Sequence, residues 1–196
     1  MKCLTLMGSP RKNGNTRQLL DPFTEELTAL GWEAETVWLY DLDLRPCTAC
    51  RACQQDRTAF GCRQQDDLHP LFPRILTADL VLLATPIYSW FCTPPMKAAM
   101  DRMIYAGCKY YGEEKQPSAY WMKQVATLTT CGYKPSHGAD LWEEALKRWC
   151  KHGEMDYLGM YCRRDMGKKE EFMDEKTEFD VRDFAHALYI TVGHSM

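Results

Sequence analysis

The sequence predicts a single α/β domain in which helices cover both faces of a five-stranded parallel sheet. Short apolar segments alternate with longer segments of helical periodicity along the 196 residues, and no internal repeat breaks the alternation. Residues 80–84 are apolar throughout, as in a strand that is covered on both faces. Hydrophobic residues make up 45% of the chain and charged residues 26%, which are ordinary values for one globular domain over residues 1–196.

Five segments have the length and composition of strands. They are residues 3–7, 32–39, 79–84, 124–130 and 155–162. Segments with apolar residues at helical spacing separate or follow them. These are residues 16–30, a short segment after 66, 96 to about 105, 140–152 and 176–192. Because helices separate successive strands, we expect a doubly wound sheet with the flavodoxin-like strand order 2-1-3-4-5.

Glycine, proline and acidic residues mark the ends of two predicted helices. Gly31 ends the first helix, as a residue in the left-handed conformation commonly does. Asp66 and Asp67 are expected to cap the second helix. Pro70 and Pro73 limit its first turns, because proline lacks a backbone N–H.

The loop between the first strand and the first helix has the composition of an anion site. It reads Gly-Ser-Pro-Arg-Lys-Asn-Gly-Asn-Thr over residues 8–16. Such a loop brings backbone N–H groups, hydroxyls and a guanidinium to the positive end of the following helix. The candidate ligands are Ser9, Arg11, Asn13, Gly14, Asn15 and Thr16. The alternative is an ordinary glycine-containing turn between a strand and a helix.

The spacing within this loop indicates which anion it suits. A nucleoside triphosphatase loop needs Lys-Ser or Lys-Thr after its last glycine, whereas Gly14 is followed by Asn15. A dinucleotide fingerprint needs three closely spaced glycines, and only Gly8 and Gly14 are present. A single terminal phosphate remains, as in a mononucleotide such as FMN.

Two further loops should meet the first one, because ligands of doubly wound sheets bind over the carboxyl ends of the strands. The loop after the third strand offers Pro86, Ile87, Tyr88, Ser89 and Trp90, and the loop after the fourth offers Thr130, Cys131 and Gly132. Flat aromatic side chains and backbone amides suit an isoalloxazine ring. The alternative for residues 86–90 is a proline-rich turn with core aromatics.

Charge and hydropathy exclude several classes of partner. The formal charge is -3, from 24 basic and 27 acidic residues, and no basic stripe suggests nucleic acid. The N-terminal apolar run, residues 3–7, is shorter than the core of a signal peptide, and no segment approaches the ~20 apolar residues of a membrane helix. We expect a cytoplasmic protein with a small-molecule partner, in which ten cysteines serve as thiols, metal ligands or redox groups.

Three motifs together resemble the flavodoxin-like NAD(P)H-dependent FMN reductases, and the iron-sulfur flavoproteins most of all. They are G-S-P-R-x-x-G-N-T at 8–16, P-x-Y-S at 86–89 and M-K-x-x-x-D-R at 96–102. The resemblance has specific motifs to about residue 102 and continues in architecture to about 162. It implies an FMN-dependent oxidoreductase that passes electrons from NAD(P)H, or from a ferredoxin-like donor, to a quinone, nitro or azo compound, flavin, metal or oxygen.

The resemblance also implies a homodimer or homotetramer and needs no catalytic acid or base, because the flavin performs the redox chemistry. An electron carrier without a small-molecule substrate is the main alternative. A flavin-binding protein whose thiol loop senses redox state or metal is a third reading.

A long loop from Tyr40 to about Gln65 carries Cys47-x2-Cys50-x2-Cys53-x8-Cys62, which resembles the cysteine motif of the iron-sulfur flavoproteins. Its last gap is longer than the usual one in that family. The four residues are candidate ligands of a four-iron four-sulfur cluster. A loop of inert thiols, a zinc site and a redox disulfide are the alternatives.

The other six cysteines are expected to be small core residues, with Cys131 the exception to watch. The aromatic-rich insertion at about 106–121 either forms a dimer contact, covers a ligand or packs on the edge of the sheet.

Overall fold

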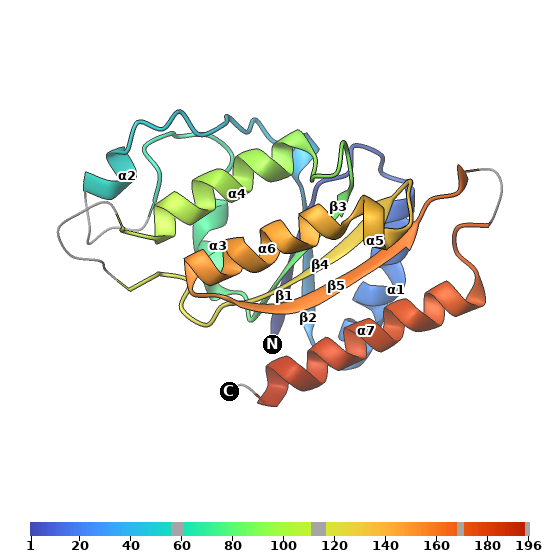
Figure 1. Cartoon of the computed structure of the whole chain (residues 1–196). Helices are drawn as coiled ribbons and strands as arrows, with labels where there is room; N and C mark the ends of the chain where they lie inside the picture. The colour runs from blue at the N-terminus through green and yellow to red at the C-terminus, as the bar shows by residue number, and fades with distance from the viewer. Residues whose placement is uncertain (56–60, 111–116, 168–170, 195–196) are drawn as a thin grey trace.

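A computed structural model describes residues 1–55, 61–110, 117–167 and 171–194 and shows a five-stranded sheet with helices on both faces (Figure 1). All neighbouring strands are parallel, in the order β2-β1-β3-β4-β5. The strands are β1 Lys2–Met7, β2 Glu33–Trp38, β3 Leu80–Pro86, β4 Gln124–Cys131 and β5 Asp156–Arg164. The predicted fold class and strand order are therefore confirmed.

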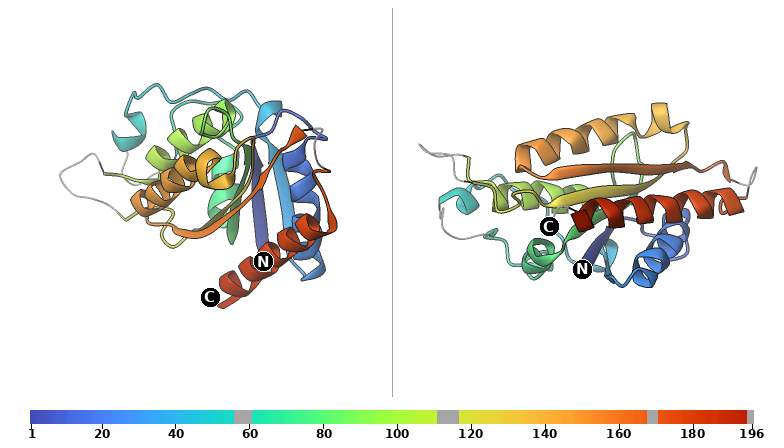
Figure 2. Two further views of the ribbon diagram at one scale, coloured as in Figure 1. Left: turned by 45° about the vertical axis from the view of Figure 1, so that its right-hand side comes forward. Right: turned by 90° about the horizontal axis from the view of Figure 1, so that it is seen from below.

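The main helices lie where the periodicity of the sequence predicts them. They are α1 Asn15–Ala29, α3 Leu71–Thr77, α4 Pro94–Gly107, α6 Asp140–Gly153 and α7 Glu175–His194. Helices α3, α4 and α6 cover one face of the sheet, and α1 and α7 cover the other (Figure 2). Three short helical turns lie in loops and were not expected: η1 Leu39–Asp41, α2 Ala52–Gln55 and α5 Pro135–Gly138.

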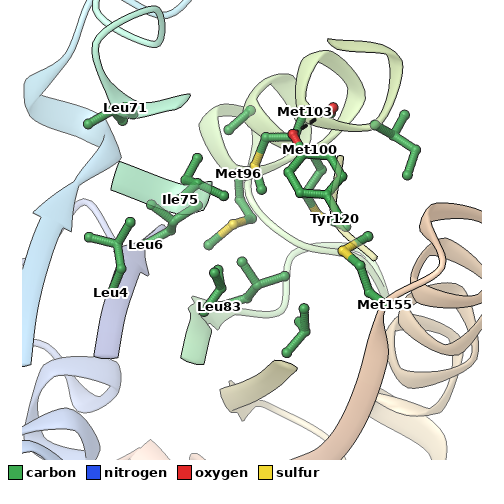
Figure 3. Packing of buried hydrophobic residues seen from close by; sticks show 14 of the residues in the cluster. Leu4, Leu6, Leu71, Ile75, Leu83, Met96, Met100, Met103, Tyr120 and Met155 are labelled. Carbon is green, nitrogen blue, oxygen red and sulfur yellow. Dashed lines mark hydrogen bonds between the residues drawn. The ribbon is translucent and has the colours of Figure 1, made fainter. Parts of the chain in front are cut away.

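The core has two layers because successive side chains of a strand point to opposite faces. Strand β3 is buried along its whole length. Leu4, Leu6 and Leu83 belong to the cluster under α3, α4 and α6, whereas Leu80 and Leu82 belong to the cluster under α1 and α7. Figure 3 shows the first cluster, including Leu71, Ile75, Met96, Met100, Met103, Tyr120 and Met155.

Helix α7 is fastened to α1 by rings and by one arginine. The rings of Phe23 and Phe184 have centroids 6.1 Å apart. Arg182 of α7 donates to the carbonyl oxygen of Pro22 at 3.4 Å and to Glu25 at 2.7 Å. The first and last helices of the described chain therefore support each other.

The strand register places the carboxyl ends of the central strands at one edge. Met7 pairs with Ala84, and Pro86 pairs with Thr130. The loops that leave β1, β3 and β4 must therefore begin close together.

The expected cap of the second helix is wrong. Helix α3 begins at Leu71, after Pro70 at its N-cap position, so Asp66 and Asp67 precede it by a full turn. Asp66 instead forms an ion pair with Arg102, and both side chains are fully buried. Gly31 has a φ of +86°, as predicted for the residue that ends α1.

The insertion at 106–121 is partly explained by packing. Tyr120 is buried and its hydroxyl donates to the carbonyl oxygen of Met103 at 2.9 Å, while Trp121 is 65% exposed. Tyr111 and the charged residues 113–115 lie outside the described residues, so a dimer contact or a ligand cover stays a prediction. Within the described chain, no helix combines the length and hydrophobicity needed to cross a membrane.

Candidate functional site

The turn between β1 and α1 is fastened to β3 and α4 at Gly8. The N–H of Gly8 donates to the carbonyl oxygen of Ala84 at 2.7 Å, and the hydroxyl of Thr93 donates to the carbonyl oxygen of Gly8 at 2.7 Å. A Cβ at Gly8 would lie 2.9 Å from Oγ1 of Thr93 and 3.2 Å from Cε of Met96. Glycine is needed here because the backbone runs directly against α4.

The rest of the turn closes on itself. Oγ of Ser9, which is buried, accepts the N–H of Arg11 at 3.2 Å, and the N–H of Gly14 donates to the carbonyl oxygen of Arg11 at 3.1 Å. The side chain of Lys12 takes no part in these contacts. It forms an ion pair with Asp41 and lies over the ring of Trp38.

Arg11 and Asn13 are exposed at the rim of this turn. Arg11 forms no ion pair with any residue in the described ranges. Its guanidinium is therefore available to an anion, in contrast to the ammonium of Lys12.

The start of α1 is also open to an anion. Gly14 occupies the N-cap position and has no side chain to cap the helix, and the first turn holds no acidic residue. Asn15 and Thr16 begin the helix, and the hydroxyls of Thr16 and Thr130 are 3.0 Å apart. The first N–H groups of a helix lack intrahelical partners and attract anions. A phosphate of FMN fits this end of α1.

The loop after β3 contains a tight turn that exposes two aromatic side chains. Tyr88 and Phe91 exchange backbone hydrogen bonds of 2.8 and 3.1 Å, and between them Ser89 and Trp90 have φ values of +50° and +65°. Each left-handed residue other than glycine costs about 1–3 kcal/mol. The turn leaves Tyr88 45% exposed and Trp90 47% exposed.

Trp90 is held in place by the segment after β4. Its ring stacks on Tyr133, with centroids 5.9 Å apart and planes 9° apart, and its Nε1 donates to the carbonyl oxygen of His137 at 3.0 Å. The N–H of Ile87 donates to the carbonyl oxygen of Thr130 at 2.8 Å. Buried Pro86 and Thr130, buried Cys131 and exposed Gly132 complete this edge.

The structure thus brings together the three predicted loops, and it adds residues that the sequence did not reveal. Thr93, Tyr133 and His137 position the loops although none was predicted, and Thr85 of the predicted β3 loop accepts the N–H of Thr93 at 3.4 Å. Thr93 had a signal, because a threonine before two prolines is typical of a helix N-cap. Its hydroxyl bonds to Gly8 rather than to its own helix.

The cysteines of the loop at about 40–65 are less closely grouped than the residues of the three loops described above. Cys47 and Cys53 line a cavity of about 140 Å³ together with Tyr105, while Cys50 is exposed and Cys62 is partly buried. Among the residues that the structure describes, no three histidine, cysteine or acidic side chains are close enough to hold one metal ion. The thiol chemistry suits a cluster, but the loop would have to close to bring four sulfur atoms together.

The loop's thiols differ in acidity. Hydrogen bonds from the backbone of Ala52 and from Thr48 lower the pKa of Cys50. Burial raises the pKa of Cys53, and the nearby thiols of Cys62 and Cys47 add to this rise.

The base of this loop is anchored by the buried pair of Arg102 and Asp66. The Nη1 of Arg102 also donates to the carbonyl oxygen of Arg45 at 3.2 Å, and its Nη2 donates to that of Gln64 at 3.2 Å. Burial alone would raise the pKa of Asp66, but the hydrogen bonds from Arg102 and from the N–H of Arg45 lower it overall. The carboxylate is therefore the form that the fold stabilises.

The remaining cysteines mostly pack in the core, as predicted. Cys3, Cys92, Cys108, Cys131 and Cys150 are buried, and Cys162 is partly buried. Burial raises the pKa of Cys3, Cys92 and Cys150 to about 12.

Comparison with protein families gives a match to the family described as NADPH-dependent FMN reductase over residues 1–161. An iron-sulfur flavoprotein of Archaeoglobus fulgidus is 33% identical over 150 residues, which cover 76% of this chain and 64% of the relative. The match thus spans less than two thirds of that protein. An iron-sulfur flavoprotein of Methanosarcina thermophila is 30% identical over 189 residues, which cover 86% of this chain and 93% of the relative.

Solved structures share the fold. An NAD(P)H:quinone oxidoreductase from Methanothermobacter marburgensis superposes with a TM-score of 0.72 at 20% identity, over 96% of this chain and 98% of that chain. An FMN-dependent NADH-azoreductase from Bacillus anthracis, in complex with FMN, gives 0.72 at 13% identity, over 96% and 99% of the two chains.

Proposed function

Because the chain belongs to the family of NADPH-dependent FMN reductases, we propose that it is an FMN-dependent oxidoreductase. Electrons pass from NAD(P)H, or from a reduced protein donor, to a small acceptor such as a quinone, nitro or azo compound, flavin, metal or oxygen. The observation that carries this proposal is the open N-terminus of α1, which contacts Thr130 at the end of β4. The same residue accepts the N–H of Ile87 in the β3 loop, and that loop exposes Tyr88 and Trp90.

The β1–α1 turn binds the phosphate of FMN in this proposal. The N–H groups at the start of α1 and the hydroxyls of Ser9 and Thr16 donate to it, and Arg11 supplies the opposing charge. Asn13, Gly14 and Asn15 complete the cradle.

The loops after β3 and β4 bind the ring system. Residues 86–90 and 130–132 contact it, and Tyr88 and Trp90 offer flat surfaces that exclude water from one side. Bound FMN supplies the electron and hydride chemistry, so the chain's own residues bind and orient the reactants.

The phosphate contact is tested by comparing FMN with riboflavin, which lacks the phosphate. Arg11→Ala should weaken FMN binding about 10- to 100-fold, because a hydrogen bond to a charged group contributes about 1.5–3 kcal/mol. Riboflavin binding should not change. Lys12→Ala is the matched control, because Lys12 is engaged by Asp41, and it should leave FMN affinity within a few-fold. Equal losses for both flavins, or for both variants, would contradict this role of Arg11.

The reductase activity is tested by anaerobic mixing of the FMN-loaded protein with NADPH or NADH. We expect the absorption of oxidised flavin to disappear at least as fast as the enzyme turns over. It should return when a quinone or an azo dye is added. No bleaching by either nicotinamide, together with rapid reduction by a reduced ferredoxin, would favour the electron-carrier alternative.

A second proposal concerns the cysteine loop. Both relatives described above carry the name iron-sulfur flavoprotein. We propose that Cys47, Cys50, Cys53 and Cys62 bind a four-iron four-sulfur cluster once the loop closes. Anaerobically purified protein should contain about four irons and four sulfides per chain, and Cys50→Ser should lower both without lowering FMN content. Iron-free protein after anaerobic reconstitution would reject the cluster in favour of a thiol loop, and one zinc per chain would identify a zinc site.

We further propose that the protein is located in the cytoplasm, a reducing compartment. We also propose that it forms a homodimer or homotetramer. All ten cysteines are free thiols, which suits a compartment that keeps thiols reduced. A light-scattering mass equal to one chain of 22.7 kDa at micromolar concentration would exclude the oligomer.

A further inference from the structure

Two sulfur atoms meet at the edge of the candidate flavin site, and the proposed function assigns no role to the contact between them. Cys131 is the last residue of β4, Cys162 lies in the neighbouring strand β5, and their Sγ atoms are 3.5 Å apart. We propose that Cys131 and Cys162 are a reversible redox pair, which hydrogen peroxide converts to a disulfide and a thiol reductant restores.

The register of the two strands explains the contact. Cys131 pairs with Arg164 and Thr129 pairs with Cys162, so the two cysteines are offset by two residues and their side chains share one face of the sheet. A disulfide has an S–S distance of about 2.05 Å, so the sulfur atoms must approach by roughly 1.5 Å. Cys131 is the last residue of β4, so the movement need involve only the end of that strand, which continues into Gly132.

The two thiols are not equivalent. The hydrogen bond from Cys162 lowers the pKa of Cys131 against the opposing effect of burial, and the charge of Arg164 assists. The same contact raises the pKa of Cys162, and burial adds to the rise. Since the thiolate is the nucleophile in thiol oxidation, Cys131 is the attacking residue and Cys162 resolves the product.

The chemistry balances with peroxide as the only oxidant. The Cys131 thiolate attacks one peroxide oxygen, the O–O bond breaks, and the leaving hydroxide takes up a proton to form water. The Cys162 sulfur then attacks the sulfenic acid on Cys131, the S–O bond breaks, and a second water leaves. Two thiols lose two electrons in total and the peroxide gains them.

The pair lies at the edge of the proposed FMN site: Cys131 belongs to the segment 130–132 that is proposed to contact the ring, whereas Cys162 of β5 has no role there. Cys131 directly follows Thr130, whose hydroxyl contacts that of Thr16 in α1. The proposal does not depend on the proposed reductase activity, because added peroxide supplies the oxidant and the readout is a covalent bond.

The sequence offers a direct assay for the bond. Trypsin should release residues 124–147, since Pro135 protects the bond after Lys134, and residues 152–163. Each of these peptides contains one cysteine, Cys131 and Cys162 respectively. The protein as isolated is treated with equimolar peroxide and its free thiols are alkylated. It is then digested without reduction, and the peptide masses are measured by mass spectrometry.

We expect the two peptides to appear joined, about 2 Da below the sum of their masses because two hydrogens are lost, and to separate with dithiothreitol. Sulfoxide on Met155 or Met160 adds oxygen and does not imitate this loss. In Cys162→Ser, Cys131 should be trapped as a dimedone adduct of its sulfenic acid. The control Cys150→Ser, which removes a buried thiol of α6, should form the same joined peptides as the wild type.

Two results would overturn the proposal. One is alkylation of both Cys131 and Cys162 at a peroxide dose that has already oxidised cysteines of the 47–62 loop. The other is a bond from either residue to a different cysteine in the folded protein.

Discussion

The β1–α1 turn and the loop that carries Cys47 to Cys62 lie beside the same sheet but are held in different ways. The turn is bonded to β3 and α4 through Gly8, and α1 is bonded to β4 through Thr16. The loop is anchored at its base by Arg102, while its cysteines remain partly or fully exposed. The phosphate site proposed for the turn would therefore form with the fold itself, whereas the thiol site proposed for the loop would depend on its ligand to close.

The largest effect on stability is expected from removing the buried ion pair at the base of the cysteine loop. Arg102→Met leaves the buried carboxylate of Asp66 without its partner, and such a loss costs about 3–5 kcal/mol of unfolding free energy. Urea denaturation measures the change. Arg148→Ala, which removes an exposed pair with Glu144, should change the stability by less than about 0.5 kcal/mol. Equal stability of the two variants would show that the buried pair does not hold the loop.

A smaller effect is expected from crowding the assembled turn. Gly8→Ala places a methyl group 2.9 Å from Oγ1 of Thr93, and overpacking of this kind costs about 1–3 kcal/mol. FMN binding should weaken as well, because the turn must move. Gly193→Ala in α7 is the control, since its Cβ would meet no atom within 4 Å and the residue lies outside the proposed FMN site. Thermal unfolding and FMN titration of both variants would separate them, and matching behaviour would argue against a rigid turn.

Acid should act on the loop's anchor. The folded-state pKa of Asp66 is lowered relative to an unfolded value of about 3.9. Its stabilising contribution is therefore complete above that value and is lost as the pH falls through the lower, folded pKa. Asp66→Asn should flatten the fall of unfolding free energy between pH 4 and the acid limit, relative to the wild type. An unchanged acid slope would mean that Asp66 keeps an ordinary pKa in the folded protein.

The smallest expected effect is a difference in reactivity between two thiols of the cysteine loop. In iron-free protein, Cys50 should react with iodoacetamide before Cys53, because Cys50 is exposed with a lowered pKa and burial raises that of Cys53. Peptide mass analysis of a time course measures the order. Iron loading should protect both residues. Faster reaction of Cys53 would show that the loop has a different arrangement in solution.

The contrast between a site made of consecutive residues and one made of distant residues also explains which features could be predicted from the sequence. Periodicity places the strands and main helices because each depends on local spacing, and the turn at 8–16 can be recognised because its residues are consecutive. Asp66 was assigned to the wrong partner because Arg102 is 36 residues away. Thr93 and the contact of Cys131 with Cys162 depend on how strands and loops align, which composition does not encode.

The fastening of α1 to α7 has a consequence for the order in which the protein matures during synthesis. The ribosome makes the residues of α1 early, but Phe23 and Glu25 meet Phe184 and Arg182 only after residues 175–194 have left the exit tunnel. Until then one face of the sheet lacks its second helix, and the part of α1 that packs against α7 stays uncovered. This face of the sheet is therefore expected to be completed only after α7 has been made.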